Sequence, residues 1–222
     1  MGRTLEANRL LAGSACGKRR RARPLNSVVR RHEWGDALMT RRIFLDTEWT
    51  APPWSKRSEL KWIGLADEEG RSWYGISSEV DIDPSTNDFI SGVFRLITPD
   101  EPRLANEEIA AAIIDFCGDV DEFWAWIPTM QRFSAWFGLG EEGAEVYAKF
   151  WDVDLQMVRP LVQPWPDGWP DRLLDLNAAA VEARVQIPPR AVNHLHPRVH
   201  AEWNRKLFDL IRESRESWNR DA

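Results

Sequence analysis

The hydrophobic positions of the chain predict strands in its earlier part and mainly helices later. An apolar run predicts a first strand over residues 42–46. Residues 61–66 and 72–77 predict a β-hairpin, with its turn in the acidic, glycine-containing stretch 68–70. The aromatic stretch 122–127 predicts another strand, because aromatic side chains favour strands.

Helical patterns surround this last strand. Residues 106–117 predict a helix with Asn106 as its N-cap, and Thr129 is expected to cap a short helix that ends at Gly138. Longer helices are expected at residues 144–161, 171–183 and 200–217. Three strands, a helix, a fourth strand and then helices resemble the order of an RNase H-like domain. The predicted fold is therefore α/β, a mixed sheet of five strands or fewer flanked by helices.

Composition narrows the class of protein. Hydrophobic residues make up 43% of the 222 residues, which is enough to bury a core. No apolar run approaches the ~20 residues needed to span a bilayer, so no membrane partner is expected. Cys16 and Cys117 are the two cysteines. A disulfide framework or cysteine zinc site is therefore not expected, and the reducing cytoplasm is the expected compartment.

Charge is unevenly distributed along the chain. The net charge is −6, yet residues 1–38 are rich in Lys and Arg, so residues 39–222 carry the acidic excess. We expect 1–38 to be a disordered basic tail, or else a mis-assigned start with Met39 as the true first residue. Residues 39–222 would then form the folded domain. An acidic domain argues against broad phosphate-backbone binding but leaves room for a small metal-dependent site.

Two carboxylates, Asp46 and Glu48, follow the first predicted strand directly. Residues two apart on a strand project to the same face, where their charges repel each other. A hard cation such as Mg²⁺ or Mn²⁺ removes this conflict, because these ions prefer carboxylate oxygens. The alternative is an ordinary strand end, with Asp46 capping the following turn and Glu48 in solvent.

Several stretches resemble the bacterial DEDD-type 3′–5′ exoribonuclease family, which has a DnaQ-like exonuclease fold of the RNase H superfamily. These stretches are "IFLDTEWT", "EFWAW", "WFG" and "HPRVHAEWNRKLF", within roughly residues 42–212. Asp46 and Glu48 match the family's metal-binding Asp and Glu. The resemblance implies a two-metal site with Mg²⁺ or Mn²⁺. It also implies single-stranded nucleic acid as substrate, RNA preferred, and leaves a homodimer open.

The family's second motif is altered in this sequence. The family places an Asp after the fourth strand, but no Asp lies between Trp124 and Gly138 here, and Thr129 or Gln131 occupies that region. Asp152, in "FWDVDLQM", is the preferred substitute, because Trp151-Asp152 resembles the "YD" of the family's motif. Asp152 and Asp154 cannot share one face of a helix, so at most one of them is expected in the site. The alternative is that both are exposed helix charges.

The family's last motif contains a general-base His and a metal-binding Asp. Here His200 stands where the Asp is expected, and His194 and His196 flank the expected base position. His196 or His194 is the predicted base, since imidazole titrates near neutral pH. A His at the ligand position shifts metal preference toward Mn²⁺ or Zn²⁺. Alternatively, the segment is a polar loop that caps the last helix. Asp175 is expected to be structural.

Four tryptophans have two possible roles. They fall in expected loops, where they either stack on bases or pack against prolines: Trp49, Trp54, Trp165 and Trp169.

The predicted function is a metal-dependent 3′–5′ exonuclease acting on RNA or single-stranded DNA. The alternative is a catalytically impaired member of the same fold that binds nucleic acid or protein. A third hypothesis is a hydrolase of smaller phosphodiesters.

Overall fold

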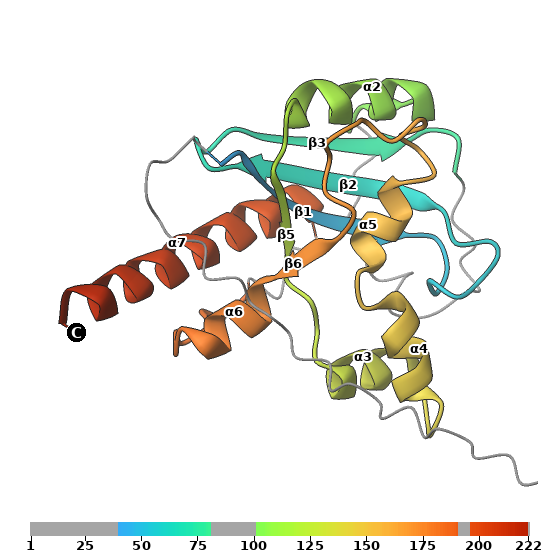
Figure 1. Cartoon of the computed structure of the whole chain (residues 1–222). Coiled ribbons are helices and arrows are strands. Elements are labelled where there is room, and N and C mark those ends of the chain that lie inside the picture. Colours follow the sequence, from blue (N-terminus) through green and yellow to red (C-terminus); the bar gives the residue numbers. More distant parts are fainter. Residues whose placement is uncertain (1–39, 81–100, 191–195, 222) are drawn as a thin grey trace, which may run out of the picture. The chain divides into compact units, whose positions relative to one another are not determined.

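The computed structural model describes residues 40–80, 101–190 and 196–221, all of which belong to the unit Leu38–Ala222 (Figure 1). The predicted boundary after residue 38, the segment 81–100 and His194 lie outside these residues. In the described part of the chain, no helix has the length and apolarity needed to cross a membrane.

A six-stranded mixed sheet forms the centre of the fold. Its strands are β1 (Arg42–Trp49), β2 (Leu60–Asp67), β3 (Ser72–Ser77), β4 (Arg103–Leu104), β5 (Glu122–Ala125) and β6 (Leu173–Asp175). Their spatial order is β4-β3-β2-β1-β5-β6. β1 is antiparallel to β2 and parallel to β5. The α/β prediction is confirmed, and the arrangement is compatible with an RNase H-like fold. The limit of five strands was wrong, because the short β4 and β6 extend both edges.

Helices cover both faces of the sheet. They are α2 (Asn106–Cys117), α3 (Met130–Phe137), α4 (Gly143–Phe150), α5 (Val153–Val158), α6 (Leu176–Glu182) and α7 (Pro197–Asp221). Ile43 and Leu45 pack in one core with α2 and α5. Phe44 packs in a second core with α6 and α7. Because side chains alternate along a strand, the odd positions of β1 face α5 and the even positions face α7.

Local sequence signals were read correctly at the hairpin and at α3. The turn between β2 and β3 contains Gly70, whose φ of 86° requires glycine. Thr129 caps α3 by accepting a hydrogen bond from the N–H of Arg132, and Gly138 ends the helix in the left-handed conformation. The predicted cap of α2 was one residue late. Ala105 is the N-cap, and the amide of Asn106 accepts a hydrogen bond from Ser77 instead.

Two predicted helices were wrong because tertiary packing divides them. The expected helix at 144–161 is interrupted at Trp151 and Asp152, so α5 is a separate helix that packs on β1. The expected helix at 171–183 begins as strand β6, which pairs with β5. Asp175 then caps α6 by accepting a hydrogen bond from the N–H of Asn177 at 2.8 Å. Asp175 therefore has a structural role.

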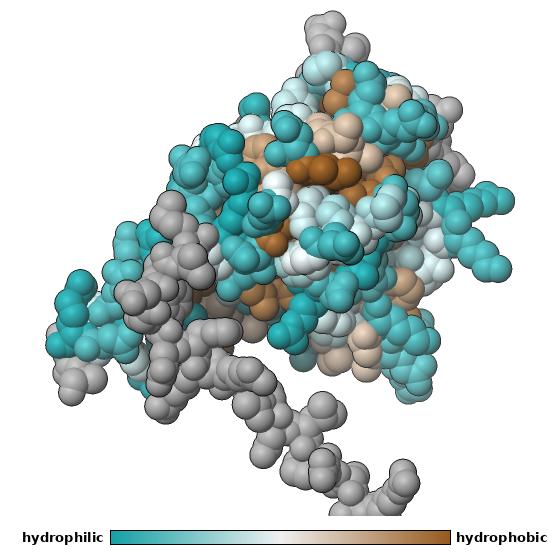
Figure 2. All heavy atoms as spheres, turned by 45° about the horizontal axis from the view of Figure 1, so that its top comes forward, coloured by the Kyte–Doolittle hydropathy of each residue, from teal (hydrophilic) through white to brown (hydrophobic). Residues whose placement is uncertain are grey.

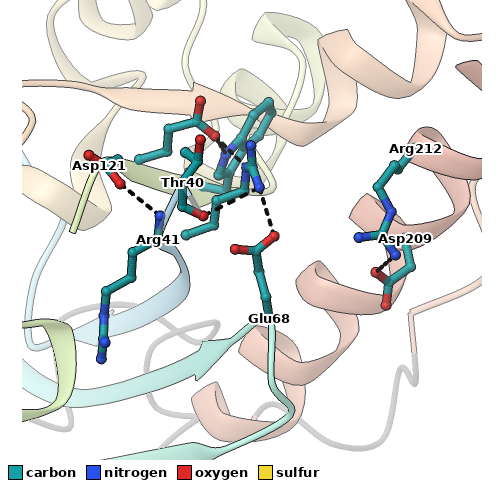
Figure 3. Close-up of polar contacts among 9 residues, drawn as sticks. Thr40, Arg41, Glu68, Asp121, Asp209 and Arg212 are labelled. Atoms are coloured by element: carbon teal, nitrogen blue, oxygen red, sulfur yellow. Dashed lines mark hydrogen bonds and ion pairs between the residues drawn. The ribbon is translucent and has the colours of Figure 1, made fainter. Parts of the chain in front are cut away.

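Ion pairs hold the start of β1 (Figure 3). The guanidinium of Arg42 contacts Glu68 in the β2–β3 turn and Glu122 at the start of β5, each at 2.7 Å. The backbone N–H of Arg41 also donates to Asp121 at 2.7 Å. These contacts tie β1 to both neighbouring strands and so set the position of the carboxylates at its far end.

The exposed apolar side chains are dispersed. Figure 2 shows a face on which hydrophobic atoms occur in small groups between hydrophilic ones. The large hydrophobic residues exposed in the described part of the chain are Trp54, Ile114, Met130, Val181, Leu210 and Trp218. They come from the β1–β2 loop and four different helices.

Candidate metal centre

The end of β1 carries Asp46 and Glu48 on the face covered by α7. β5 pairs with β1 only as far as Phe44, so the last part of β1 has an open edge on that side. Asp46 is 9% exposed, and Glu48 is partly buried. Two carboxylates therefore lie side by side at a strand end that solvent reaches only in part.

Helix α7 brings His200 to these carboxylates. The helix can approach because Gly64 of β2 has no side chain. A Cβ atom at Gly64 would lie 2.2 Å from backbone atoms of Pro197 and Arg198. Asn204, one turn after His200, is fully buried, and its amide donates to the carbonyl of Leu45 at 2.9 Å. This bond anchors α7 on β1 and places the imidazole of His200 above Asp46.

Asp46, Glu48 and His200 form a group of metal-ligand type. Each offers one donor atom, and these atoms lie within 4.8 Å of one another. The Nδ1 atom of His200 is 3.1 Å from Oδ2 of Asp46, so the two atoms share a hydrogen bond or bind one ion together. Two carboxylates and an imidazole fit a divalent cation, and the imidazole favours Mn²⁺ or Zn²⁺ relative to an all-oxygen site.

A third carboxylate, Asp154, reaches the same strand end from the opposite face. Its Oδ1 accepts hydrogen bonds from the N–H of Thr47 at 3.0 Å and from its hydroxyl at 2.6 Å. Leu155 packs beside it in the core against β1. Asp154 thereby satisfies the backbone at the open edge of the strand. It also supplies a carboxylate where the sequence showed no match to the family's second Asp.

The structure brings Asp154, rather than the preferred Asp152, next to β1, and neither belongs to the group of Asp46, Glu48 and His200. Asp152 precedes α5, and its carboxylate accepts a hydrogen bond from the side chain of Gln156. The prediction treated residues 144–161 as one helix, and the break at Asp152 changes which carboxylate faces β1. Of the other proposed substitutes, Thr129 caps α3 and Gln131 is exposed.

Burial and mutual repulsion perturb the three carboxyl groups. Burial raises the pKa of Glu48 well above its usual range, and the charges of Asp46 and Asp154 add to this. Burial and the charge of Asp46 raise the pKa of Asp154 to about 7. Burial also acts to raise the pKa of Asp46, but His200 and Arg190 outweigh it and the net pKa is lowered. The pKa of one carboxyl group is thus lowered while those of its two neighbours are raised, as expected where a cation would relieve repulsion.

Arg190 is a fourth charged group at this site and was not predicted. Its Nη2 lies 2.8 Å from Oδ1 of Asp46. The guanidinium carbon lies 4.9 Å from the ring centre of Trp126 and 5.2 Å from that of Trp203. The Nε atom is buried and has no hydrogen-bond partner among the described residues. Arg190 and His200 together engage both oxygens of Asp46.

His196, one of the two predicted bases, caps α7. Its Nδ1 accepts a hydrogen bond from the N–H of Arg198 at 3.1 Å, and its Nε2 lies 3.4 Å from Glu101. The ring packs against Trp62 and Tyr74. With Nδ1 accepting, the neutral ring carries its proton on Nε2 and directs it to Glu101, so neither nitrogen is free to take a proton from water. The geometry therefore favours the capping interpretation of this residue.

The loop tryptophans divide into two groups. Trp165 and Trp169 pack around Phe123 beside the core, so they are structural. Trp49, next to Glu48, stacks on Phe137 with ring centres 5.9 Å apart. Trp54, which is 37% exposed, contacts the same ring edge-on. Trp54 is thus an accessible ring in an aromatic cluster with Trp49, the residue that follows Glu48 in the sequence.

Comparison with known proteins adds no assignment, because neither a family model nor a curated protein matches the sequence. The geometry of the site therefore carries the functional argument. Sequence reasoning found Asp46, Glu48 and His200 but missed Arg190 and chose against Asp154. A usable signal existed for Asp154, which lies between two buried apolar residues, Val153 and Leu155. Arg190 has no such signal, since its partner is 144 positions away.

Proposed function

We propose that this protein is a divalent-metal-dependent 3′–5′ exonuclease that hydrolyses phosphodiester bonds in RNA or single-stranded DNA. The convergence of Asp46, Glu48 and His200 at one strand end is the observation that supports the proposal most directly. Asp154 adds a carboxylate beside them through Thr47. The resemblance of the surrounding motifs to DEDD exoribonucleases supplies the reaction and the preference for RNA.

The roles of the residues follow from their positions. Asp46, Glu48 and His200 would hold Mg²⁺ or Mn²⁺, with Asp154 as a further ligand or a partner of Thr47. A divalent ion, when bound, acidifies water for attack on phosphorus and offsets charge on the phosphate oxygens. Asn204 keeps α7, and with it His200, against β1. His196 would fix the start of that helix.

The substrate would approach along the aromatic cluster of Trp49, Trp54 and Phe137. The exposed ring of Trp54 offers a surface on which an unpaired base can stack, an interaction that tolerates any base. The chain carries a net charge of −6, so charge alone gives little nonspecific affinity for phosphate. Recognition would therefore depend on stacking and on the metal. The low cysteine content agrees with action in the cytoplasm.

One assay tests the proposal directly. End-labelled single-stranded RNA is incubated with the full chain and Mn²⁺ or Mg²⁺, alongside Asp46→Asn and the matched control Asp152→Asn. Stepwise shortening from the 3′ end that Asp46→Asn abolishes and Asp152→Asn preserves is the expected result. RNA that stays full length with every metal, under conditions where the chain is folded, would refute the exonuclease.

A second candidate function rests on the occupancy of Asp46. Arg190 and His200 already engage both of its oxygens, and a His replaces the family's ligand Asp. These features favour a protein that no longer hydrolyses RNA but still binds it. In the same assay, this candidate predicts that RNA is retained in a mobility-shift gel without shortening. Trp54→Ala would then weaken the shift, while Asp46→Asn would leave it unchanged.

A further inference from the structure

Arg190 stands in an unusual position for a residue beside a metal site. Its charge lies against a ligand carboxylate, because Nη2 is 2.8 Å from Oδ1 of Asp46. That charge also acts on Glu48 and Asp154. This one guanidinium therefore offsets, in part, the negative charge that a divalent ion would otherwise neutralise.

We infer that Arg190 is a built-in cation that competes with a divalent metal for Asp46. The inference rests on the proposed function, since it assumes the metal centre. An ion that used Oδ1 of Asp46 would displace the guanidinium. An ion that used Oδ2 with His200 would meet its repulsion across the same carboxylate. Either route makes metal affinity lower with Arg190 in place than without it.

The surroundings of Arg190 suit a cation that holds this position without being fixed there. The guanidinium lies over the rings of Trp126 and Trp203, and such cation–π contacts stabilise a positive charge in a partly buried site. Its Nε, however, has no partner among the described residues, so the group is held by one ion pair and two rings. The contact to Asp46 can break while the stacking remains.

Arg190 could instead strengthen metal binding, and an experiment must distinguish this role from competition. A residue that hydrogen-bonds a ligand carboxylate can orient it and so strengthen metal binding. Removing such a positioning residue would weaken the affinity for metal. The sign of the change on removing Arg190 therefore decides between competition and positioning.

The experiment is Mn²⁺ titration of the full, metal-stripped chain by calorimetry, with Asp46→Asn, Arg190→Gln and Arg190→Lys compared with the unaltered protein. Competition predicts that Arg190→Gln binds Mn²⁺ about tenfold more tightly, within the roughly 5–150-fold range common for coupled ligands. Arg190→Lys, which keeps the charge, should stay near the original affinity. Metal-free Arg190→Gln should also melt at a lower temperature, because Asp46 loses its partner.

The other outcomes are distinct. Equal or weaker Mn²⁺ binding by Arg190→Gln, with binding by the unaltered chain still dependent on Asp46, overturns the competition and leaves the metal centre intact. No Mn²⁺ binding by either protein refutes the metal centre and this inference with it. If Arg190→Gln fails to fold, side-chain NMR of the unaltered protein replaces the titration of that variant. Mg²⁺ should restore free rotation to the Nη protons of Arg190, and Nη protons that stay held while metal binds would overturn the proposal.

Discussion

At the scale of single residues, environment separates three carboxyl groups of similar intrinsic acidity. His200 and Arg190 lower the pKa of Asp46, whereas burial and the charge of Asp46 raise the pKa of Glu48 and of Asp154. Binding of a divalent ion at this site would therefore be coupled to proton release.

The first prediction concerns pH and stability without metal. Asp154 has a pKa of about 7 when folded, against an ordinary 3.8, so the unfolded chain loses this proton first as pH rises. The stability that the group contributes is complete below about pH 4 and is lost as pH rises through 7. Urea unfolding in EDTA should show this loss between about pH 4 and 7, on the order of a few kcal/mol.

A matched variant isolates this contribution. Burial lowers the pKa of His196 from its ordinary value of 6.5. The contribution of His196 to stability therefore increases as pH rises toward 6.5, which is opposite in sign to that of Asp154. Asp154→Asn should flatten the decline between about pH 4 and 7, whereas Asp152→Asn should leave the curve as it was. An unchanged slope in Asp154→Asn would contradict the assignment of the raised pKa.

The second prediction compares the same two carboxylates in metal binding. Asp154→Asn should weaken Mn²⁺ binding measurably, through the lost charge beside Asp46 and the weakened contact to Thr47. Asp152→Asn makes the identical chemical change two residues earlier and should bind Mn²⁺ like the unaltered chain. Calorimetric titration of both variants measures the difference. Equal losses would mean that α5 acts through its fold rather than through Asp154.

At the scale of elements, the approach of α7 to β2 determines whether the site exists. Gly64→Ala would place a Cβ atom 2.2 Å from the backbone of Pro197 and Arg198. The helix must then shift, at a cost at or above the ~1–3 kcal/mol typical of overpacking. Gly140→Ala is the control, since its Cβ would meet an ordinary 3.6 Å contact with Glu142. Thermal melts should show a large decrease for Gly64→Ala alone.

The β1–β2 loop carries the prediction for substrate binding. Trp54→Ala should weaken binding of single-stranded RNA by about 1–3 kcal/mol, the usual contribution of one stacked base. Trp218→Ala removes a more accessible indole, 52% exposed against 37% for Trp54, at the far end of α7 and should leave RNA binding unchanged. Fluorescence anisotropy with labelled RNA measures both. Equal affinities would place the base-binding surface elsewhere.

At this scale the sequence was informative where contacts are local. The β2–β3 hairpin and the two ends of α3 could be predicted, because Gly70, Thr129 and Gly138 act within a few residues of themselves. The break between α4 and α5 could not, because it depends on how α5 packs against β1. That break decides between Asp152 and Asp154, whose hydrogen bond to Thr47 spans 107 positions. The sequence thus indicated Asp46, Glu48 and His200 but not Asp154 or Arg190.

At the scale of the whole molecule, metal binding should be visible as stability. A ligand that binds only the folded chain stabilises it by about 2.7 kcal/mol at a hundred times its dissociation constant. Mn²⁺ should therefore raise the melting temperature of the full chain, and EDTA should reverse the rise. Asp46→Asn should abolish the effect. A rise of equal size in that variant would mean that Mn²⁺ binds somewhere other than the strand end.

The docking of α7 also has a consequence in time. Asp46 and His200 are 154 positions apart, and a ribosome adds roughly 5–20 residues per second. A nascent chain therefore carries the carboxylates of β1 for about 8–30 s before the imidazole is even synthesised. Asn204 and the residues that pack α7 follow later still. Until α7 has left the ribosome, the nascent chain would thus lack His200 and with it the complete group of Asp46, Glu48 and His200.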